Sequence, residues 1–269
     1  MELSYPIPDL AQWAARGEKK LLSVIIPAHN EESTITRTVL ALVEVLSRAE
    51  IAHEILVIND NSVDSTEECL VALQNAQASV RYLNNQYPKG FGFAIRYGLK
   101  YFRGDAVAIV MADGSDSPED LVSFYAVLCS GYDCVFGSRF ISGGRVVNYP
   151  RQKLFLNRVG NTVIRWMFGI AYNDVSNACK IYRRSVIAGI QPLLSAHFNL
   201  TVEIPLKSMV RGYKIAVIPN SWHGRTHGKS KFKIRVLGVR YLCTIFYCYF
   251  EKWLWKDNGD CSPLCDNDV

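Results

Sequence analysis

The sequence predicts an α/β protein in which helices flank a mostly parallel sheet and an amphipathic helix lies near the C-terminal end. Over residues 21–120, short apolar runs rich in Val and Ile alternate with segments whose apolar residues recur at helical spacing. Each apolar run ends in polar residues. Strands that alternate with helices in this way pair in parallel through right-handed crossovers, which predicts an open sheet with one polar edge.

Four buried strands are expected in this part of the chain, at 21–26, 54–58, 80–83 and 107–111. In the first helix, the apolar residues from Ile35 to Leu46 recur at a spacing that puts one stripe toward the sheet. A capping-box sequence at 65–68 predicts the start of the second helix. The third helix is expected to open at 89–92.

The second part of the chain continues the alternation with longer connections. Helices are expected at 118–129, 151–168, 199–210 and 232–255, and strands at 134–137, 178–182 and 213–218. A mobile loop is expected at 143–145 and a basic loop at 220–231. The domain organisation that follows is a lead-in at 1–20, a main domain at 21–231, a helical appendage at 232–256 and a flexible tail at 257–269.

The composition limits the classes of function. The chain has 269 residues, of which 49% are hydrophobic, and a formal net charge of +5. Cations crowd at 225–240, which favours a phosphate-bearing ligand or an anionic lipid surface and argues against nucleic acid as a partner. The eight cysteines lack metal-ligand spacing, so reduced cysteines in a cytosolic protein are expected. Neither a signal peptide nor a membrane-spanning helix is expected from the apolar stretches.

The stretch that ends the fourth strand carries the strongest chemical signal. Asp113, Ser115 and Asp116 follow the apolar run directly, with Gly114 between them and Pro118 opening a helix. Ligands collect at the carboxyl ends of the strands in an open parallel sheet, and hard oxygen ligands hold Mg²⁺ or Mn²⁺. The stretch therefore predicts a divalent-metal site facing a phosphate. An acidic turn that caps the next helix is the alternative.

The other strand ends supply polar residues to the same edge. They are Asn30, Glu31, Asp60 and Lys89. Together with Asp113 they predict a nucleotide site, whereas the ordinary polar loops of a structural domain are the competing interpretation. A dinucleotide-dependent dehydrogenase is disfavoured because G-x-G-x-x-G does not follow the first strand.

Six motifs stand in order at 24–32, 57–64, 89–94, 111–114, 137–139 and 225–231. They are similar to an opening strand with a P-x-x-N-E turn, a V-V-D-D-G-S-x-D segment, a glycine-rich turn, an acidic triplet, G-S-R and R-x-x-G-x-S-K. Together they resemble the motifs of the family 2 glycosyltransferases, in the branch of dolichol-phosphate mannose synthase. The resemblance implies a Rossmann-like nucleotide-diphospho-sugar transferase fold and an inverting transfer of a hexose.

The resemblance also implies roles for single residues. The nucleotide-binding residues that it implies are Pro27, Ala28, His29, Asn30, Glu31, Asp60, Asn61, Lys89, Gly90 and Asp113. The implied ligands of Mg²⁺ or Mn²⁺ are Asp113, Ser115 and Asp116, and the implied catalytic residues are Asp113, Asp116 and Arg139. The implied phosphate- or acceptor-binding residues are Arg139, Arg225, Lys229, Ser230 and Lys231. The glycines at 90 and 92 would let the backbone approach the ligand, and Asn61 would adopt a left-handed turn.

Three positions depart from the family pattern. Met111 replaces the first acid of the triplet, Asn59 replaces the first Asp of the second motif, and Lys180 stands where Arg is common. Because methionine is a poor ligand for a hard cation, the metal would depend on the rest of the acidic stretch, phosphate oxygens and water. Arg165 and Trp166 lack the Q-x-x-R-W signature of processive synthases and are expected to pack inside the protein.

The acceptor decides which chemistry the site must perform. A polyprenyl phosphate is already anionic, so transfer to it needs positive charge rather than a strong base. A saccharide hydroxyl in surface polysaccharide synthesis would need a carboxylate to take its proton, and Asp116, Asp174 and Glu203 are the candidates. A catalytically silent nucleotide-binding relative is a third interpretation, because of the departures at 59 and 111.

The last helix indicates where the protein acts. Val239, Leu242, Phe246, Phe250 and Trp253 fall on one stripe, beside lysines and further aromatic residues. This pattern is typical of a helix that lies in a membrane interface, although a helix packed on the domain would show the same stripe. We therefore expect a peripheral enzyme at the cytoplasmic face of a membrane, with a nucleotide sugar and a lipid-phosphate or glycan acceptor as partners. A homo-oligomer or a membrane partner subunit stays open.

Overall fold

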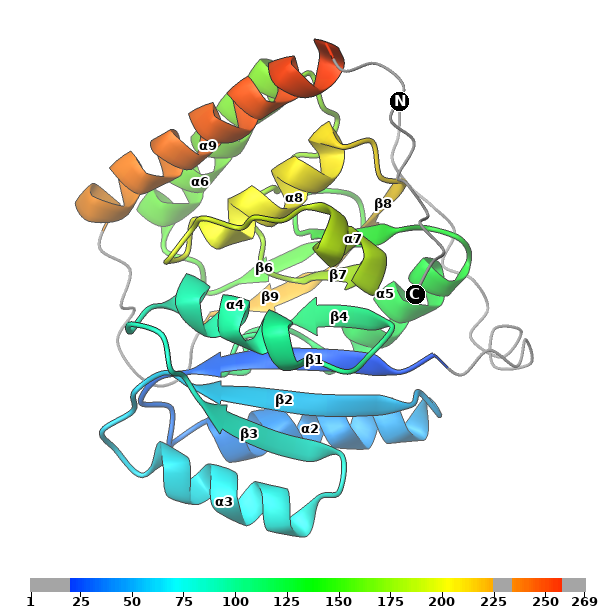
Figure 1. Ribbon diagram of the computed structural model, residues 1–269, viewed down its shortest axis with the longest axis vertical. Coiled ribbons are helices and arrows are strands. Elements are labelled where there is room, and N and C mark those ends of the chain that lie inside the picture. The colour runs from blue at the N-terminus through cyan, green and yellow to red at the C-terminus, as the bar shows by residue number, and fades with distance from the viewer. Residues whose placement is uncertain (1–19, 225–233, 258–269) are drawn as a thin grey trace, which may run out of the picture.

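The computed structural model describes residues 20–224 and 234–257 of the chain. Seven strands form one sheet in the order β3-β2-β1-β4-β7-β5-β8, and helices lie on both sides of it (Figure 1). Two further strands, β6 and β9, form a small second sheet. The prediction of an α/β protein with a mostly parallel sheet is confirmed.

The first part of the chain alternates strand and helix as predicted. Its elements are β1 (Leu22–Ala28), α2 (Ile35–Arg48), β2 (His53–Asn59), α3 (Thr66–Ala76), β3 (Val80–Asn84), α4 (Phe91–Tyr101) and β4 (Ala106–Ile109). All four strands are parallel, with Ala28 opposite Asn59 and Asn59 opposite Asn84. Their C-terminal ends therefore lie on one side of the sheet, which we call the carboxyl edge.

The second part of the chain contains the reversal in strand direction. Its elements are α5 (Pro118–Cys129), β5 (Cys134–Ser138), β6 (Arg145–Val147), α6 (Arg151–Phe168), β7 (Lys180–Arg183), α7 (Arg184–Gly189), α8 (Leu200–Val210), β8 (Ile215–Pro219), β9 (Ser221–His223) and α9 (Ile234–Asp257). Strand β7 runs antiparallel between β4 and β5. It does so because the segment after α6 returns to the carboxyl edge before it enters the sheet.

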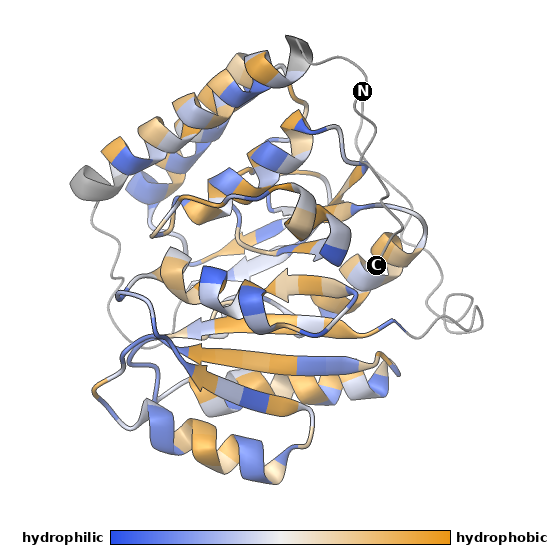
Figure 2. Cartoon of the chain, viewed as in Figure 1, coloured by the Kyte–Doolittle hydropathy of each residue, from blue (hydrophilic) through white to orange (hydrophobic). Residues whose placement is uncertain are grey.

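The main sheet separates two hydrophobic cores. Successive residues of a strand point to opposite faces, so Val24 and Ile26 join the core under α2, α3 and α5, whereas Ile25 joins the core under α4, α7 and α8. All three side chains are fully buried. Burying one such side chain stabilises the fold by about 1.5–3 kcal/mol. Because β1 and β2 are buried on both faces, their apolar residues are nearly continuous, as the orange colouring in Figure 2 shows.

Three local expectations differ in part from the structure. The segment expected to be a mobile loop at 143–145 leads into β6, and β6 pairs in parallel with β9, which lies in the expected basic loop at 220–231. Strands of three residues are too short to carry a periodic signal. The capping box at 65–68 is not formed either, because Asp64 Oδ1 accepts the hydrogen bond from the Thr66 amide at 3.1 Å and Ser65 makes no side-chain cap.

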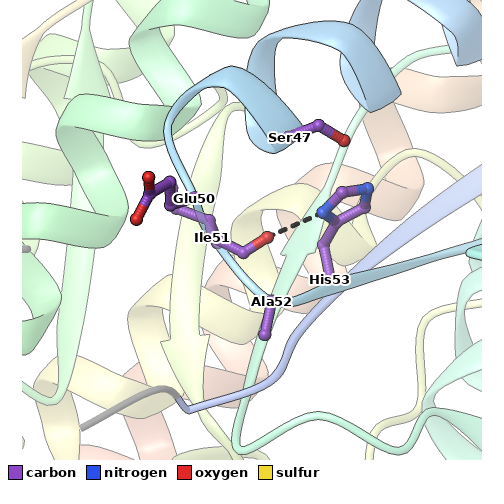
Figure 3. A pocket seen from close by; sticks show the side chains of 5 residues that line it. All are labelled: Ser47, Glu50, Ile51, Ala52 and His53. Atoms are coloured by element: carbon purple, nitrogen blue, oxygen red, sulfur yellow. Dashed lines mark hydrogen bonds between the residues drawn. The ribbon is translucent and has the colours of Figure 1, made fainter. Parts of the chain in front are cut away.

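A cavity of about 560 Å³ opens where α2 leads into β2 (Figure 3). Its lining residues are Ser47, Glu50, Ile51, Ala52 and His53. The His53 ring is held against the Ile51 carbonyl, with Nδ1 at 2.8 Å from the oxygen. The cavity lies at the amino end of β2, the opposite edge of the sheet from the predicted site, so it takes no part in that site.

Helix α9 packs on the domain through a different side from the predicted apolar stripe. Thr244, Ile245 and Cys248 are buried against the domain. The predicted stripe at Val239, Leu242, Phe246, Phe250 and Trp253 is instead between 49% and 64% exposed. The stripe therefore does not serve the hydrophobic core.

Helix α6 also carries large apolar side chains on its outer side. Asn161, Ile164 and Phe168 are buried, whereas large apolar side chains face outward. The exposed apolar residues of α6 are Phe155, Leu156, Val159, Val163 and Trp166. The expectation that Trp166 packs inside the protein was wrong, because its side chain is 85% exposed.

Helices α6 and α9 pack against each other and form the layer farthest from β3 (Figure 1). The Lys252 ammonium of α9 donates to the Phe168 carbonyl at the end of α6, at 2.7 Å. We call the exposed apolar side chains of the two helices the outer apolar face. None of the helices within residues 20–224 and 234–257 is long and apolar enough to cross a membrane.

Candidate active site

Asp113 and Asp116 lie in the turn that follows β4 at the carboxyl edge. Asp113 Oδ1 accepts a hydrogen bond from the Ser115 amide at 3.0 Å, and Asp116 Oδ2 accepts one from the Met111 amide at 3.2 Å. Gly114 between them has a φ of +69°, a conformation that favours glycine. Both carboxylates are buried. The turn therefore fixes two acids at the end of an apolar strand, as the sequence predicted.

The buried position of Asp116 changes its acidity. Burial raises the pKa of Asp116 to about 6, and the negative charge of Asp113 adds to the rise. The hydrogen bond from Met111 and the positive charge of Arg139 act in the opposite direction. Asp113, Asp116 and Arg139 are thus close enough to interact electrostatically. Two buried carboxylates in one turn form a site that can accept a cation.

Arg139 follows β5 and is held rigidly. Its Nε and Nη2 donate to the two carboxylate oxygens of Asp174 at 2.8 and 2.7 Å, and its amide donates to Asp174 at 3.0 Å. Burial alone would lower the pKa of Arg139, but the bonds and charge of Asp174 outweigh it and raise that pKa. The arginine is therefore a fixed positive charge beside Asp116.

Lys180 organises the segment that carries Asp174. Its ammonium group is buried and donates to the carbonyls of Val175, at 2.9 Å, and Asn177. Burial lowers the pKa of Lys180 to about 7, although the charge of Asp174 opposes this shift. Lys180 thus acts inside the protein, in support of the Arg139–Asp174 pair.

Asp60 holds a turn of the protein's own backbone. Its carboxylate accepts hydrogen bonds from Asn85 Nδ2 at 2.8 Å and from the Gly90 amide at 3.0 Å. These bonds link the end of β2 to the segment between β3 and α4. Sequence reasoning missed Asn85, because its partner lies 25 residues earlier in the chain.

The turn after β1 and the turn after β2 are bound to each other. His29 Nδ1 lies 2.8 Å from the Asp60 carbonyl oxygen, and the Asn30 amide donates to Ser62 Oγ at 3.0 Å. The Glu31 amide donates to Thr66 Oγ1 at 2.9 Å. Pro27 and Ala28 are buried at the end of β1. The predicted nucleotide-binding residues of these two turns therefore form one connected structure.

Asn61 has a φ of +55°, so the expected left-handed turn is confirmed. Its neighbour Asn59 donates through Nδ2 to Asn84 Oδ1 at 2.8 Å across β2 and β3. Asn59 Oδ1 accepts the Ser62 amide at 3.3 Å. The family's first Asp is thus replaced by an amide that bonds to a neighbouring amide without charge, and Asn84 is a further residue of the edge that the sequence did not indicate.

Packing inside the protein explains why glycine stands at 90 and 92, whereas the expectation was a close approach of the backbone to the ligand. A Cβ on Gly90 would lie 2.6 Å from the Ala196 oxygen, and a Cβ on Gly92 would lie 2.5 Å from the Ser195 oxygen. Glycine is required here because the backbone of 195–197 packs against this turn. Lys89, which precedes Gly90, is exposed at the same edge.

Strand β9 crosses the acidic turn from the other side. Asp116 forms a β-bridge with Trp222, and the His223 amide donates to the Ser115 carbonyl at 3.0 Å. The Trp222 ring packs on Tyr149, with ring centroids 4.8 Å apart. Trp222 is a residue of the site that sequence reasoning missed. The predicted phosphate-binding residues Arg225, Lys229, Ser230 and Lys231 follow it and lie outside the described residues.

The donor set of the edge fits a divalent cation only in part. No cluster of three or more His, Cys, Asp or Glu side chains suited to a metal occurs among the residues that the structure describes. Asp113 and Asp116 provide two buried carboxylates, and carboxylates are hard ligands that suit Mg²⁺ or Mn²⁺. The set suits a cation that takes its remaining ligands from a diphosphate and water.

The two other candidate bases are engaged elsewhere. Asp174 is fully buried in its bidentate pair with Arg139. Glu203 is also fully buried and accepts the amides of Leu194 and Ser195, each at 2.7 Å. Both carboxylates therefore stabilise loops, and neither is positioned to take a proton from an acceptor.

Comparison with known proteins identifies the family. The model of the family described as Glycosyl transferase family 2 matches residues 23–190. Polyprenol monophosphomannose synthase of Mycolicibacterium smegmatis is 28% identical over 233 residues, which cover 81% of this chain and 86% of that protein. Undecaprenyl-phosphate mannosyltransferase of Micrococcus luteus is 28% identical over 221 residues, which cover 80% of this chain and 88% of that protein.

Solved structures of glucosyl-3-phosphoglycerate synthase from Mycobacterium tuberculosis share the fold. The complex with Mg²⁺ and uridine diphosphate matches with a TM-score of 0.69 at 17% identity, over 91% of this chain and 85% of that chain. The complex with Mn²⁺ and uridine-diphosphate-glucose also has a TM-score of 0.69 at 17% identity, over 92% of this chain and 85% of that chain. At this identity the likeness concerns the fold.

Proposed function

This chain belongs to glycosyl transferase family 2, and we propose that it transfers a hexose from a GDP- or UDP-sugar to a polyprenyl phosphate at a membrane surface. The observation that carries this proposal is the meeting of Asp113, Asp116 and Arg139 at the carboxyl edge. Two carboxylates suit a cation bound to the donor diphosphate, and a fixed arginine suits a second anion beside it. The two mannosyltransferases that resemble the chain, each 28% identical, are named for polyprenol and undecaprenyl phosphate.

Asp113 and Asp116 would hold Mg²⁺ or Mn²⁺, with Ser115 of the same turn as a further ligand. Such a cation, when bound, neutralises the charge that develops on the departing diphosphate. Two of the solved structures that share the fold are complexes with Mg²⁺ and Mn²⁺, which supports this assignment. Met111 adds no ligand of the required kind.

The donor would bind along the turns after β1, β2 and β3. His29, Asn30, Glu31 and Asn61 come from turns that are bonded to each other, so they form a preorganised surface for a nucleoside. Lys89 is exposed at the same edge and carries a positive charge suited to phosphate. We call the segment 89–92 the donor turn, and Asp60 positions it through Gly90.

The acceptor would be a phosphate monoester, because the described edge offers a fixed cation and few bases. Arg139 supplies positive charge at a position set by Asp174. A phosphate oxygen is already anionic and needs no base, which agrees with the engagement of Asp174 and Glu203 in loop structure. Transfer to a saccharide hydroxyl is the second candidate, since an Asp116 pKa of about 6 would suit a general base.

The outer apolar face supports a lipid-linked acceptor. Exposed aromatic residues on α6 lie among Arg151, Arg158 and Arg165, and the sequence of α6 contains no acidic residue. Helices that bind anionic membrane surfaces combine apolar, aromatic and cationic residues in this way. A surface of this kind would place the edge of the sheet near a lipid phosphate.

The test is transfer of labelled sugar. Purified protein is incubated with GDP-mannose or UDP-glucose, polyprenyl phosphate in anionic vesicles, and Mg²⁺ or Mn²⁺, and label is measured in the organic phase. Label that enters the organic phase with one donor, and only when metal is present, supports the proposal. Label that instead accumulates on an added glycan favours the second candidate. Nucleotide binding without transfer to any acceptor contradicts both.

A further inference from the structure

The donor turn rests on a segment that follows α7 by several residues. The Phe93 amide at the start of α4 donates to the Ala196 carbonyl at 3.2 Å. The rings of Phe91 and Phe198 are stacked, with centroids 4.2 Å apart and planes 15° from parallel. The absence of a Cβ at Gly90 and Gly92 is what permits this close approach. Residues 195–199, which we call the strut, therefore support the donor turn from behind.

The other side of the strut is bonded to α9. Asn199 Nδ2 donates to Thr244 Oγ1 at 2.9 Å and to Ser195 Oγ at 2.8 Å. The Tyr241 hydroxyl donates to the Phe198 carbonyl at 3.1 Å. Ser195, Asn199 and Thr244 are all buried. The inner side of α9 thus holds the strut by hydrogen bonds, while its outer side carries the outer apolar face.

A continuous set of contacts joins α9 to the predicted donor site. It runs from Tyr241 and Thr244 to the strut, from the strut to the donor turn, and from Gly90 to Asp60. We propose that α9 positions the donor turn through the strut, so that Tyr241 and Thr244 are positioning residues for donor binding. This inference rests on the proposed function, in that the donor turn is taken to bind the nucleotide diphosphate.

The physical reason is that neither end of the strut is held by the sheet. Its backbone belongs to a connection between α7 and α8, and its last residues accept the first backbone hydrogen bonds of α8, such as Thr201 to the Phe198 carbonyl at 3.1 Å. It also contacts the donor turn, the buried Glu203 and α9. Removing one hydrogen bond of this set would let the strut move away from Gly90 and Phe93. A hydrogen bond of this kind accounts for about a three- to tenfold change in an equilibrium constant.

The experiment uses two variants that remove a hydroxyl and preserve shape, Tyr241→Phe and Thr244→Val. Dissociation constants for GDP and UDP are measured by calorimetry with Mg²⁺, and donor KM and kcat are measured in the transfer assay. Amide hydrogen exchange across 89–93 is measured in the nucleotide-free protein. We expect the dissociation constant and the donor KM to rise about three- to tenfold, the kcat at saturating donor to stay, and exchange across 89–93 to accelerate. Tyr249→Phe is the matched control, because Tyr249 is on the same helix but packs on Phe168 of α6.

The outcomes separate this inference from the proposed function. If both variants keep wild-type nucleotide affinity and wild-type exchange across 89–93, the positioning role of α9 is overturned and the proposed function is left intact. A loss of stability with unchanged donor KM would also overturn it, because a purely structural role predicts that result. If the wild-type protein binds neither nucleotide, the proposed donor site is wrong, and the proposal that α9 positions it for donor binding is wrong too. Hydrogen exchange across 89–93 in the variants still shows whether α9 holds the donor turn in place.

Discussion

The donor half of the protein, residues 22–116, and the layer of α6 and α9 differ in where their large apolar side chains lie. In the donor half, apolar strands are buried and the polar residues stand at the carboxyl edge. In the layer, the inward side mixes the polar Asn161 and Thr244 with apolar residues such as Ile164 and Ile245. Large apolar residues such as Phe155, Trp166 and Phe250 face outward. The two regions belong to one chain and pack on the same sheet, so their difference reflects different surroundings.

The comparison shows what each region is built to contact. A helix in water turns its apolar stripe toward the core, and contiguous apolar surface that remains exposed marks an interaction site. Polar contacts such as Arg211 Nη2 to Glu251, at 2.5 Å, instead attach α9 to the domain. On the proposed function, the donor half would bind a charged ligand from water and the layer would contact an apolar surface.

Replacing Asp113 by Ala should have the largest effect, and it tests the donor half. Without this carboxylate the cation and the departing diphosphate lose a principal ligand, so kcat/KM for sugar transfer should fall at least about 1,000-fold. Steady-state kinetics with saturating metal measure the change. Glu44→Gln on α2 is the control, because Glu44 is exposed and pairs only loosely with Arg48 at 4.0 Å. A loss smaller than about tenfold in Asp113→Ala would show that the site lies elsewhere.

Replacing Phe155 and Trp166 together by Ser tests the layer. Each large apolar side chain contributes about 1.5–3 kcal/mol when it leaves water, so the loss of two should lower partition onto anionic vesicles at least about 100-fold. Transfer to a polyprenyl phosphate in vesicles should fall with it, while nucleotide binding stays. Sedimentation with vesicles measures the partition.

The matched control for that variant is Leu40→Ser with Val71→Ser in the donor half. Leu40 and Val71 are also exposed apolar residues, at 41% and 42%, but they lie on α2 and α3. We expect their replacement to leave vesicle binding unchanged. Equal losses in the two double variants would remove the distinction between the regions, because any exposed apolar residue would then bind lipid.

Replacing Asp116 by Asn should stabilise the donor half while it impairs transfer. The folded-state pKa of about 6 lies above the usual value of about 3.9. Between these values the folded protein holds a proton that the unfolded chain has released, so stability falls as pH rises toward 6, and the full cost is present above 6. Asn carries no such cost. The variant should be more stable by about 2–3 kcal/mol at about pH 7.5, with a smaller gain at about pH 4.5.

Urea unfolding without metal measures the effect of Asp116→Asn at both pH values, because a bound cation would stabilise the wild-type carboxylate. The carboxamide oxygen that this substitution introduces would still accept the hydrogen bond from the Met111 amide. Lower stability of the variant at the higher pH would indicate that the carboxylate is favourable when the protein is folded, contrary to a raised pKa.

The smallest expected changes in stability come from replacing one glycine in each region by alanine. Gly160 in α6 has nothing near the position of a Cβ, so Gly160→Ala should stabilise the protein by about 0.5–1 kcal/mol. Gly92 in α4 faces the Ser195 oxygen at 2.5 Å from that position, so Gly92→Ala should destabilise it by about 1–3 kcal/mol. Thermal unfolding measures both. Changes of the same sign would contradict the close packing of the donor turn on the strut.

Much of the donor half could be predicted from sequence because its signals are local. Four apolar runs predicted β1 to β4 to within about three residues of their observed ends, and the polar residues after each run meet at the carboxyl edge. The turn at Asp113 and Asp116 follows from a strand that ends in acids, and the left-handed conformation of Asn61 follows from its residue type.

The contacts that complete the site could not be predicted. Asp60 bonds to Asn85, Arg139 to Asp174, and β6 to β9, and each partner lies at least 25 residues away. Composition and periodicity report on neighbours within a few turns of chain, so they carry no information on such pairings. The sequence also could not show that Gly92 is needed because the strut packs against it.

The sequence alone determined the elements, their order and the chemical groups at the carboxyl edge, because periodicity and residue type act over a few neighbouring positions. It also showed an apolar stripe on the last helix, but a stripe does not say whether it turns inward or outward. Only the tertiary structure decided that, because the direction depends on Thr244, Tyr241 and Glu251 finding partners on the domain. Those bonds, with the buried Ile245 and Cys248, hold the inner side of α9 on the domain and leave its apolar stripe outward.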